Sequence, residues 1–314
     1  MVQRIIWPQS AKPPRCVPLK SLLIACVGAF CVGAPAHGGD IYVSNGSGSV
    51  TAYTTTGGIV RSFLIGQTSN PEGLAFDSNG NLYVADDDTH VVLKIAPNGS
   101  MSTFVSGLGG PDGLAFDRHG NLFASDASAG EINEITPGGS VSTFASAQAL
   151  HFPQESIGLA FDANGNLYDA APQFNTIFEI TPSGSVSNFA TMDSPQGLTF
   201  DGKGNLYASS FDDGTITEIT PSGHKSIFAT GLIGPIGIAF DSGGNLLVAE
   251  HNSSGSIAEV SPSGVVTTFV ASTDGAPNFI AIPPVPEPSS LTLITLALAL
   301  FWRARGVGPK RPSG

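Results

Sequence analysis

Cysteine is nearly absent from this 314-residue sequence, which has three, all within the first 31 positions. A disulfide framework is therefore excluded from the rest of the chain, which depends on core burial for its stability. Lysine and arginine are also scarce, because residues 37–284 carry five of them against 24 Asp and Glu, a net charge of −19. A body this acidic repels nucleic acid and anionic lipid. We therefore expect no nucleic-acid partner, and soluble cations and basic partners are favoured.

Long hydrophobic runs are missing too. The two main apolar runs, Ser21–Val32 and Leu291–Trp302, lie near the chain ends. A helix of either length spans about 18 Å, short of the ~30 Å hydrocarbon core. Basic residues precede the first run, and a small-x-small triplet ending at Ala36 follows it. This order predicts a signal peptide, residues 1–36, cleaved after Ala36, and hence export through the inner membrane. A lipid-modified Cys26 is the alternative, although only about five apolar residues precede it.

The second apolar run lies between Pro286-Glu287-Pro288 and the two arginines Arg303 and Arg305. Over residues 285–305 this order resembles the PEP-CTERM sorting signal of Gram-negative bacteria, and residues 306–314 follow as a basic tail. The resemblance implies transient inner-membrane anchoring and cleavage by an exosortase-type protease. The processed protein would then reside in the cell envelope, at the outer surface, or in the medium. A plain tail helix without a sorting role is the alternative.

Glycine and proline are abundant, with 39 and 23 residues, and one short sequence phrase recurs along the chain. Its copies are PEGLAFD (71–77), PDGLAFD (111–117), IGLAFD (157–162), PQGLTFD (195–201) and PIGIAFD (235–241). The closing aspartates are 39 to 45 residues apart, and each is followed by a turn and Gly-Asn-Leu. Every period has room for four short strands joined by turns, and none for a helix. This is the pattern of a β-propeller blade.

Five periods are complete, and the two ends of the repeat region supply a sixth. Residues 40–64 provide three strands, and residues 277–282 (PNFIAI) match the missing first strand. We therefore predict an all-β, six-bladed β-propeller over residues 37–284, built of four-stranded antiparallel blades. The C-terminal strand closes the first blade, and helix is confined to the signal peptide and the tail. The repeats resemble NHL repeats and, more distantly, gluconolactonase-type and streptogramin-lyase-type propellers, which implies architecture and leaves function open.

Acidic residues that recur in every blade are better explained by the blade than by a site. In the Asp-x-x-Gly-Asn turns we expect Asp to accept backbone N–H groups, Gly to adopt a positive φ, and Asn to tolerate the left-handed region. These aspartates are Asp77, Asp117, Asp162, Asp201 and Asp241. The same reasoning covers the acids of the third strands, Glu134, Glu179, Glu218 and Glu259. Functional candidates must lie where the blades differ.

In a four-stranded meander, the loop entering strand one and the loop joining strands two and three emerge on the same face. These loops lack Lys and Arg, and we expect their acids to share that face: Glu72, Asp86, Asp87, Asp88, Asp112, Asp126, Glu155, Asp169, Asp212, Asp213, Glu250 and Asp274. Nearest the axis we place Glu72, Asp112, Asp126 and Glu250, oxygen donors suited to Ca²⁺. A solvated acidic rim is the alternative. The same loops carry His90, His151, His251 and Asn252.

No phosphate loop, Cys–His metal spacing or Gly-x-Ser-x-Gly elbow appears. Gluconolactonase-type enzymes have a metal-binding Glu near the first inner strand, and residues 278–282 contain none. We expect a noncatalytic binding or scaffold propeller for an extracellular protein, polysaccharide or cation. The PEP-CTERM resemblance implies a link to exopolysaccharide and biofilm. The alternative is a Ca²⁺-dependent lactonase-like hydrolase or a lyase at the axial opening, with Glu250 and His251 as catalytic candidates. Beyond Ca²⁺ we expect no cofactor.

Overall fold

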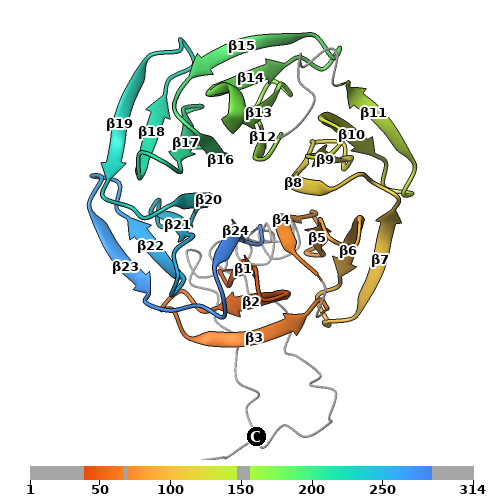
Figure 1. Cartoon of the computed structure of the whole chain (residues 1–314), viewed down its shortest axis with the longest axis horizontal. Coiled ribbons are helices and arrows are strands. Elements are labelled where there is room, and N and C mark those ends of the chain that lie inside the picture. Colours follow the sequence, from red (N-terminus) through yellow and green to blue (C-terminus); the bar gives the residue numbers. More distant parts are fainter. Residues whose placement is uncertain (1–38, 67–68, 147–155, 285–314) are drawn as a thin grey trace, which may run out of the picture. The chain divides into compact units, whose positions relative to one another are not determined.

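Six four-stranded antiparallel sheets form a ring around a common axis (Figure 1). The computed structural model describes residues 39–66, 69–146 and 156–284. The predicted signal peptide and its cleavage site at Ala36, the sorting segment 285–305, His151 and Glu155 lie outside them. Helix in the described residues is limited to one 3-10 turn, η1 (Pro172–Phe174), and no helix there is long and apolar enough to cross a membrane. The predicted propeller is confirmed.

Each blade runs from an inner strand at the axis to an outer strand at the rim. Blade 1 comprises β24 (Pro277–Ala281), β1 (Ile41–Asn45), β2 (Ser49–Tyr53) and β3 (Ile59–Leu64). Blade 2 comprises β4 (Pro71–Phe76), β5 (Leu82–Asp86), β6 (Val91–Ile95) and β7 (Met101–Ser106). Blade 3 comprises β8 (Pro111–Phe116), β9 (Leu122–Asp126), β10 (Glu131–Ile135) and β11 (Val141–Ala145). Blade 4 comprises β12 (Leu159–Phe161), β13 (Leu167–Ala171), β14 (Thr176–Ile180) and β15 (Val186–Thr191). Blade 5 comprises β16 (Pro195–Phe200), β17 (Leu206–Ser210), β18 (Thr215–Ile219) and β19 (Lys225–Thr230). Blade 6 comprises β20 (Pro235–Phe240), β21 (Leu246–Glu250), β22 (Ser256–Val260) and β23 (Val266–Val270).

Strands from the two ends of the repeat region close the ring. The C-terminal strand β24 pairs antiparallel with β1, with Tyr42 opposite Ala281 and Val43 opposite Ile280. This pairing gives blade 1 its fourth strand and closes the ring, as the sequence predicted. Figure 1 shows β24 beside β1 at the centre of the ring.

Aromatic rings fill the spaces between blades. Tyr83 of β5 makes T-shaped contacts with Phe104 of its own blade and with Phe116 of the next, at centroid distances of 4.9 and 5.0 Å. The same trio recurs around Phe123, Tyr168 and Tyr207. Such edge-to-face packing adds to the burial of apolar area. The repeated phrases Gly-Leu-Ala-Phe and Gly-Asn-Leu-Tyr therefore encode the contacts between blades.

The turns joining first and second strands follow the predicted chemistry with one correction. Asp77 Oδ1 accepts the backbone N–H groups of Asn79 and Asn81, and Gly80 adopts a φ of +77°. The asparagine does not take the left-handed region; Asn81 Nδ2 donates to Asp77 Oδ2 instead. In blades 3 to 6 the equivalent asparagine also bonds the Glu of the third strand. These recurring acids are structural, as their repetition indicated.

The inner strands approach one another so closely that they require glycine. A Cβ built on Gly113 would lie 1.8 Å from the carbonyl oxygen of Ile157 in the next blade. Equivalent positions Gly73, Gly158 and Gly197 face the next inner strand at 2.0 to 2.3 Å. Side chains near the axis must therefore come from the positions beside these glycines.

Candidate functional site at the axial face

Glu72 and Asp112 occupy the same position in the neighbouring inner strands β4 and β8, directly after a proline. Asn70 Nδ2 donates a 2.6 Å hydrogen bond to Glu72 Oε1. Burial, followed by the nearby Asp112 carboxylate, raises the pKa of Glu72 well above its usual range, although the Asn70 bond opposes this. Glu72 therefore retains a proton to a higher pH than an exposed glutamate does. The structure thus brings together two of the four carboxylates that the sequence analysis placed nearest the axis.

Asp126 and Glu250 lie at the ends of second strands, where their carboxylates bind loops. Asp126, at the end of β9, accepts the backbone N–H groups of Gly109 and Ala129 at 2.5 and 2.9 Å. Glu250, at the end of β21, accepts the Ile233 N–H at 3.0 Å and the Ser256 hydroxyl at 2.7 Å. Both carboxylates therefore tether the loop that enters their blade. Asp86 does the same in blade 2 through Asn70 N–H and the Thr89 hydroxyl.

These tethers bear on the predicted calcium site. Two of its four carboxylates already accept two hydrogen bonds each, whereas Ca²⁺ requires six to eight oxygens that converge. Within residues 39–66, 69–146 and 156–284, no group of three or more His, Cys, Asp or Glu is arranged to hold a metal. Two of the four predicted ligands therefore hold loops in this structure, and calcium binding stays a prediction.

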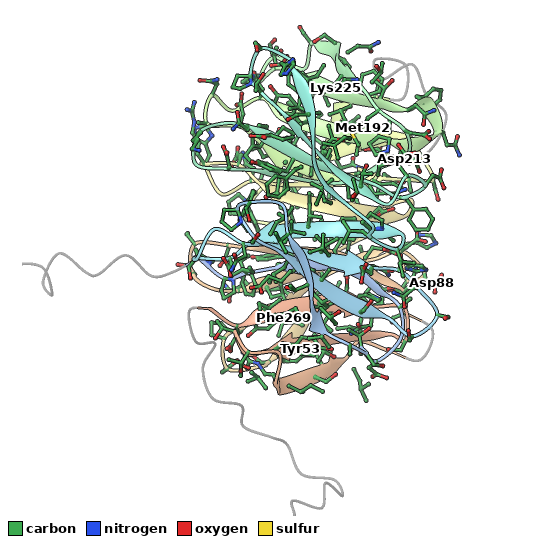
Figure 2. All side chains as sticks on the ribbon, turned by 90° about the vertical axis from the view of Figure 1, so that its left-hand side faces the viewer. Tyr53, Asp88, Met192, Asp213, Lys225 and Phe269 are labelled. Atoms are coloured by element: carbon green, nitrogen blue, oxygen red, sulfur yellow. The ribbon has the colours of Figure 1, made fainter. Side chains whose placement is uncertain are left out.

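The structure corrects the predicted acidic face at one residue, Asp169. The sequence placed it in a loop, but it lies within β13, fully buried and 0 % exposed. Equivalent positions in other blades carry small apolar residues, such as Val84 and Ala124. Its Oδ1 accepts a 2.5 Å hydrogen bond from the Ser156 hydroxyl. Asp88 and Asp213, by contrast, lie exposed on the predicted face, and Figure 2 shows both toward one side of the ring.

His251 has a defined tautomer, because its neighbour has only one possible orientation. Asn278, buried at the start of β24, donates from Nδ2 to the Pro71 carbonyl oxygen at 3.2 Å. A carbonyl only accepts, so Asn278 Oδ1 faces His251 Nδ1, 3.2 Å away. The proton of a neutral His251 therefore resides on Nδ1, which leaves the Nε2 lone pair free to accept a proton. Since Pro71 precedes Glu72, this network joins the histidine to the acidic pair.

Asn252 and His90 form turns. Asn252 Oδ1 accepts the Ser254 N–H, and its Nδ2 donates to Ser256 Oγ, so both ends of the side chain bond within its own loop. His90 is exposed and adopts a φ of +59°, at the position where blades 3, 5 and 6 have glycine. Non-glycine residues adopt this conformation at a cost of about 1 kcal/mol.

We expect His90→Gly to raise the free energy of unfolding by about 1 kcal/mol, because glycine adopts a positive φ without steric cost. Asp88→Gly, two residues away, is the matched control and should destabilise or change nothing. Urea unfolding of both variants measures the difference. Equal effects of the two substitutions would show that His90 is unstrained.

Asn278 and Asn70 are residues of the candidate site that sequence reasoning missed. Asn278 stands in the repeat position held by Glu72 and Asp112, so aligning PNFIAI with PEGLAF would have marked it. Asn70 lies in the loop before β4 and has no equivalent in the recurring phrase. Across the face, blades 2 and 3 supply carboxylates, whereas Phe211 lies beside His251, with ring centroids 6.3 Å apart, and Ile233 is exposed. Apolar side chains therefore lie on this face together with the carboxylates.

Together, the fold and this network define a six-bladed β-propeller whose polar side chains gather where the inner strands begin. The model of the virginiamycin B lyase family matches residues 28–231 and 69–284. The chain belongs to this family, which confirms the resemblance to streptogramin-lyase-type propellers.

Solved structures show the same fold at low sequence identity. A catalytically inactive histidine-to-alanine variant of virginiamycin B lyase from Staphylococcus aureus, with quinupristin, is 18% identical with a TM-score of 0.56, over 72% of this chain and 88% of that one. A nidogen/laminin complex is 19% identical with a TM-score of 0.69, over 78% of this chain and 98% of that one. A putative gluconolactonase is 16% identical with a TM-score of 0.56, over 67% of this chain and 80% of that one. No curated protein matches the sequence.

Proposed function

We propose that this protein is a lyase that opens lactone-type esters at its axial face, with His251 as general base and Glu72 as general acid. The observation that carries the proposal is the tautomer of His251, whose Nδ1 hydrogen is held by Asn278 Oδ1 at 3.2 Å. A histidine whose Nε2 can accept a proton, joined through Asn278 and Pro71 to a carboxyl group whose pKa is raised by burial, supplies the base and the acid that acid–base catalysis requires.

The reaction balances without an added reactant. Nε2 of His251 removes a proton from the carbon next to a carbonyl, and the electron pair forms a carbon–carbon double bond. The ester C–O bond at the neighbouring carbon breaks, and the departing carboxylate oxygen takes the proton of Glu72. The product is an open-chain isomer of the substrate. Proton transfer back from the histidine to Glu72, through solvent, restores both groups.

Membership of the virginiamycin B lyase family supports this choice. Phe211 and the exposed Ile233 offer apolar contacts for the hydrophobic part of a cyclic ester. A noncatalytic binding role, which the sequence alone favoured, is the second candidate. The nidogen/laminin structure supports it, because a propeller of this fold occurs there in a protein complex.

The test is incubation of the purified propeller with quinupristin and with simple lactones, followed by mass spectrometry. A lyase gives an open product of unchanged mass, whereas a hydrolase product gains the mass of one water. We expect His251→Ala to lower kcat/KM by about a hundredfold, and Glu72→Gln to lower it similarly. Asn278→Leu should lower the rate less, because it frees the histidine to adopt the wrong tautomer.

His224→Ala is the matched control, since His224 is exposed in a turn at the opposite end of its blade. It should leave the rate unchanged. If the wild-type protein opens none of the esters, the catalytic proposal fails and the binding role gains. Ring opening that survives His251→Ala would contradict the assignment of the base.

A further inference from the structure

Crevices between adjacent blades recur on the face opposite the axial site. The crevices between blades 1 and 2, 3 and 4, and 5 and 6 are each lined by the aromatic residue of a second strand, the Phe of the fourth strand, and the Phe of the next inner strand. In the crevice between blades 1 and 2 these residues are Tyr42, Phe63 and Phe76. Between blades 3 and 4 they are Phe123, Phe144 and Phe161. The two crevices can therefore be compared position by position.

A cation of the chain itself occupies the crevice between blades 1 and 2. The guanidinium carbon of Arg61 lies 5.6 Å from the ring centroid of Tyr42 and 5.1 Å from that of Phe63. Arg61 also donates a hydrogen bond to the Tyr42 hydroxyl. The remaining space is about 10 Å³. These contacts are cation–π interactions that close the crevice.

Blade 2 holds a second internal cation in an equivalent place. Lys94 of β6 pairs with Tyr83 across the strands, and its Nζ lies 5.2 Å from the centroid of the Tyr83 ring. The ring keeps its T-shaped contact with Phe104. A cation is thus accommodated over the second-strand ring without separating the aromatic pair.

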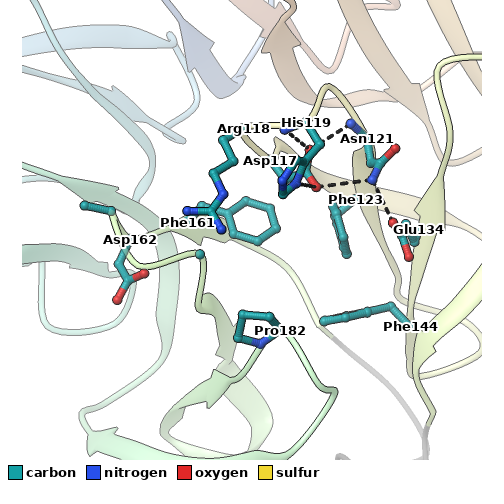
Figure 3. A pocket seen from close by; sticks show the side chains of 12 residues that line it. Asp117, Arg118, His119, Asn121, Phe123, Glu134, Phe144, Phe161, Asp162 and Pro182 are labelled. Atoms are coloured by element: carbon teal, nitrogen blue, oxygen red, sulfur yellow. Dashed lines mark hydrogen bonds and ion pairs between the residues drawn. The ribbon is translucent and has the colours of Figure 1, made fainter.

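In blade 3 the charge at this position is reversed. Glu134 pairs with Phe123 as Lys94 pairs with Tyr83. Asn121 Nδ2 donates to Glu134 Oε1 at 2.9 Å, and Phe123 has no hydroxyl of the kind that Tyr168 donates to Glu179 in blade 4. The crevice keeps a cavity of about 340 Å³ (Figure 3). That volume lies within the range of small-ligand pockets.

We propose that the crevice between blades 3 and 4 binds an organic cation, a guanidinium or alkylammonium group, over the Phe123 ring and against Glu134. The ligand supplies the charge that Arg61 and Lys94 supply in blades 1 and 2. Asp117 and Asp162 bring the carboxylates of the lining to three, and the exposed Arg118 is located at the rim beside Phe161 (Figure 3). This site is independent of the axial site and of the proposed lyase activity.

The experiment is a titration of the intact propeller with Nα-acetyl-arginine amide, followed by ligand-observed NMR. Nα-acetyl-citrulline amide, which has the same shape without charge, is the matched probe, and Nα-acetyl-lysine amide tests the ammonium group. We expect the arginine probe to bind about tenfold more tightly than the citrulline probe. Added salt should weaken the arginine probe alone.

Two variants locate the binding. Glu134→Lys introduces the cation that blade 2 carries at this position, so the fold should tolerate it while arginine binding is lost. Glu134→Gln keeps the bond with Asn121 and should weaken binding about tenfold. Asp88→Lys makes the same charge change as Glu134→Lys on the opposite face, and should leave binding unchanged. Equal affinity for arginine and citrulline probes, or unchanged affinity in Glu134→Lys, would overturn the proposal.

Discussion

Gly113→Ala is expected to lower the free energy of unfolding by about 3 kcal/mol or to prevent folding. A Cβ at this position would lie 1.8 Å from the Ile157 carbonyl oxygen and 3.0 Å from its carbon. Backbone cannot rotate away as a flexible side chain can, so β8 or β12 must shift. Such a shift breaks the hydrogen bond from Ser125 Oγ to Ile157 O, which joins the two blades at 3.0 Å. Urea unfolding measures the loss.

Gly202→Ala provides the control. Gly202 lies in a turn with nothing within 4 Å of a built Cβ, and its φ is outside the left-handed region. Alanine there should change the free energy of unfolding by less than about 0.5 kcal/mol, or stabilise slightly by restricting the unfolded chain. If both substitutions change the free energy of unfolding equally, the inner strands of blades 3 and 4 are too far apart for a Cβ on residue 113 to clash with the carbonyl oxygen of Ile157.

The architecture was predictable because one short phrase specifies both the turns and the contacts between blades. The Gly of Gly-Leu-Ala-Phe allows the inner strands to meet, and its Phe packs on the ring of the preceding blade. Repetition gave the number of blades, and the match of PNFIAI to the first strand gave the closure that pairs Tyr42 with Ala281. These features are local, so they can be read without coordinates.

The site was only partly predictable, because a loop position does not reveal which way a side chain bonds. Asp126 and Glu250 have the composition of metal ligands, yet backbone N–H groups of the entering loops take their oxygens. Glu72 and Asp112 both lie in inner strands, at the position directly after the proline. The network through Asn278 needed the structure, because its partners Pro71 and His251 are 207 and 27 residues away.

The two faces of the ring differ in how the repeats diverge. On the axial face, divergence at the position after the inner-strand proline gives Glu72, Asp112 and Asn278. On the opposite face, one third-strand position is Glu in blades 3 to 6 and Lys94 in blade 2, and the second-strand ring that pairs with it is Phe123 in blade 3 but Tyr in blades 2, 4 and 5. The scaffold residues around both positions recur from blade to blade. Substitution at a single repeat position is therefore sufficient to create a site without changing the fold.

Asp169→Ala is expected to stabilise the protein at pH 8 by about 2 kcal/mol. Burial raises the pKa of Asp169 to about 7, against which the Ser156 hydrogen bond acts. An unfolded aspartate has a pKa of about 3.9, so between pH ~4 and ~7 the folded state binds one proton more than the unfolded state. Stability therefore falls as pH rises through this window, by roughly 4 kcal/mol in all, and the loss is complete above pH ~7. Part of the gain on substitution is offset because the Ser156 hydroxyl loses its acceptor.

Unfolding in urea at pH 5 and pH 8 separates this effect from the titration of other carboxylates. Alanine is the residue that blades 3 and 5 carry at the equivalent positions, Ala124 and Ala208, so it suits the space between blades. The advantage of the variant should shrink or reverse at pH 5, where wild-type Asp169 is protonated and bonded to Ser156. Asp213→Ala, which removes an exposed carboxylate, should show no such change between the two pH values. A difference between Asp169→Ala and wild type that stays constant from pH 5 to pH 8 would mean that Asp169 is already ionised in the folded protein.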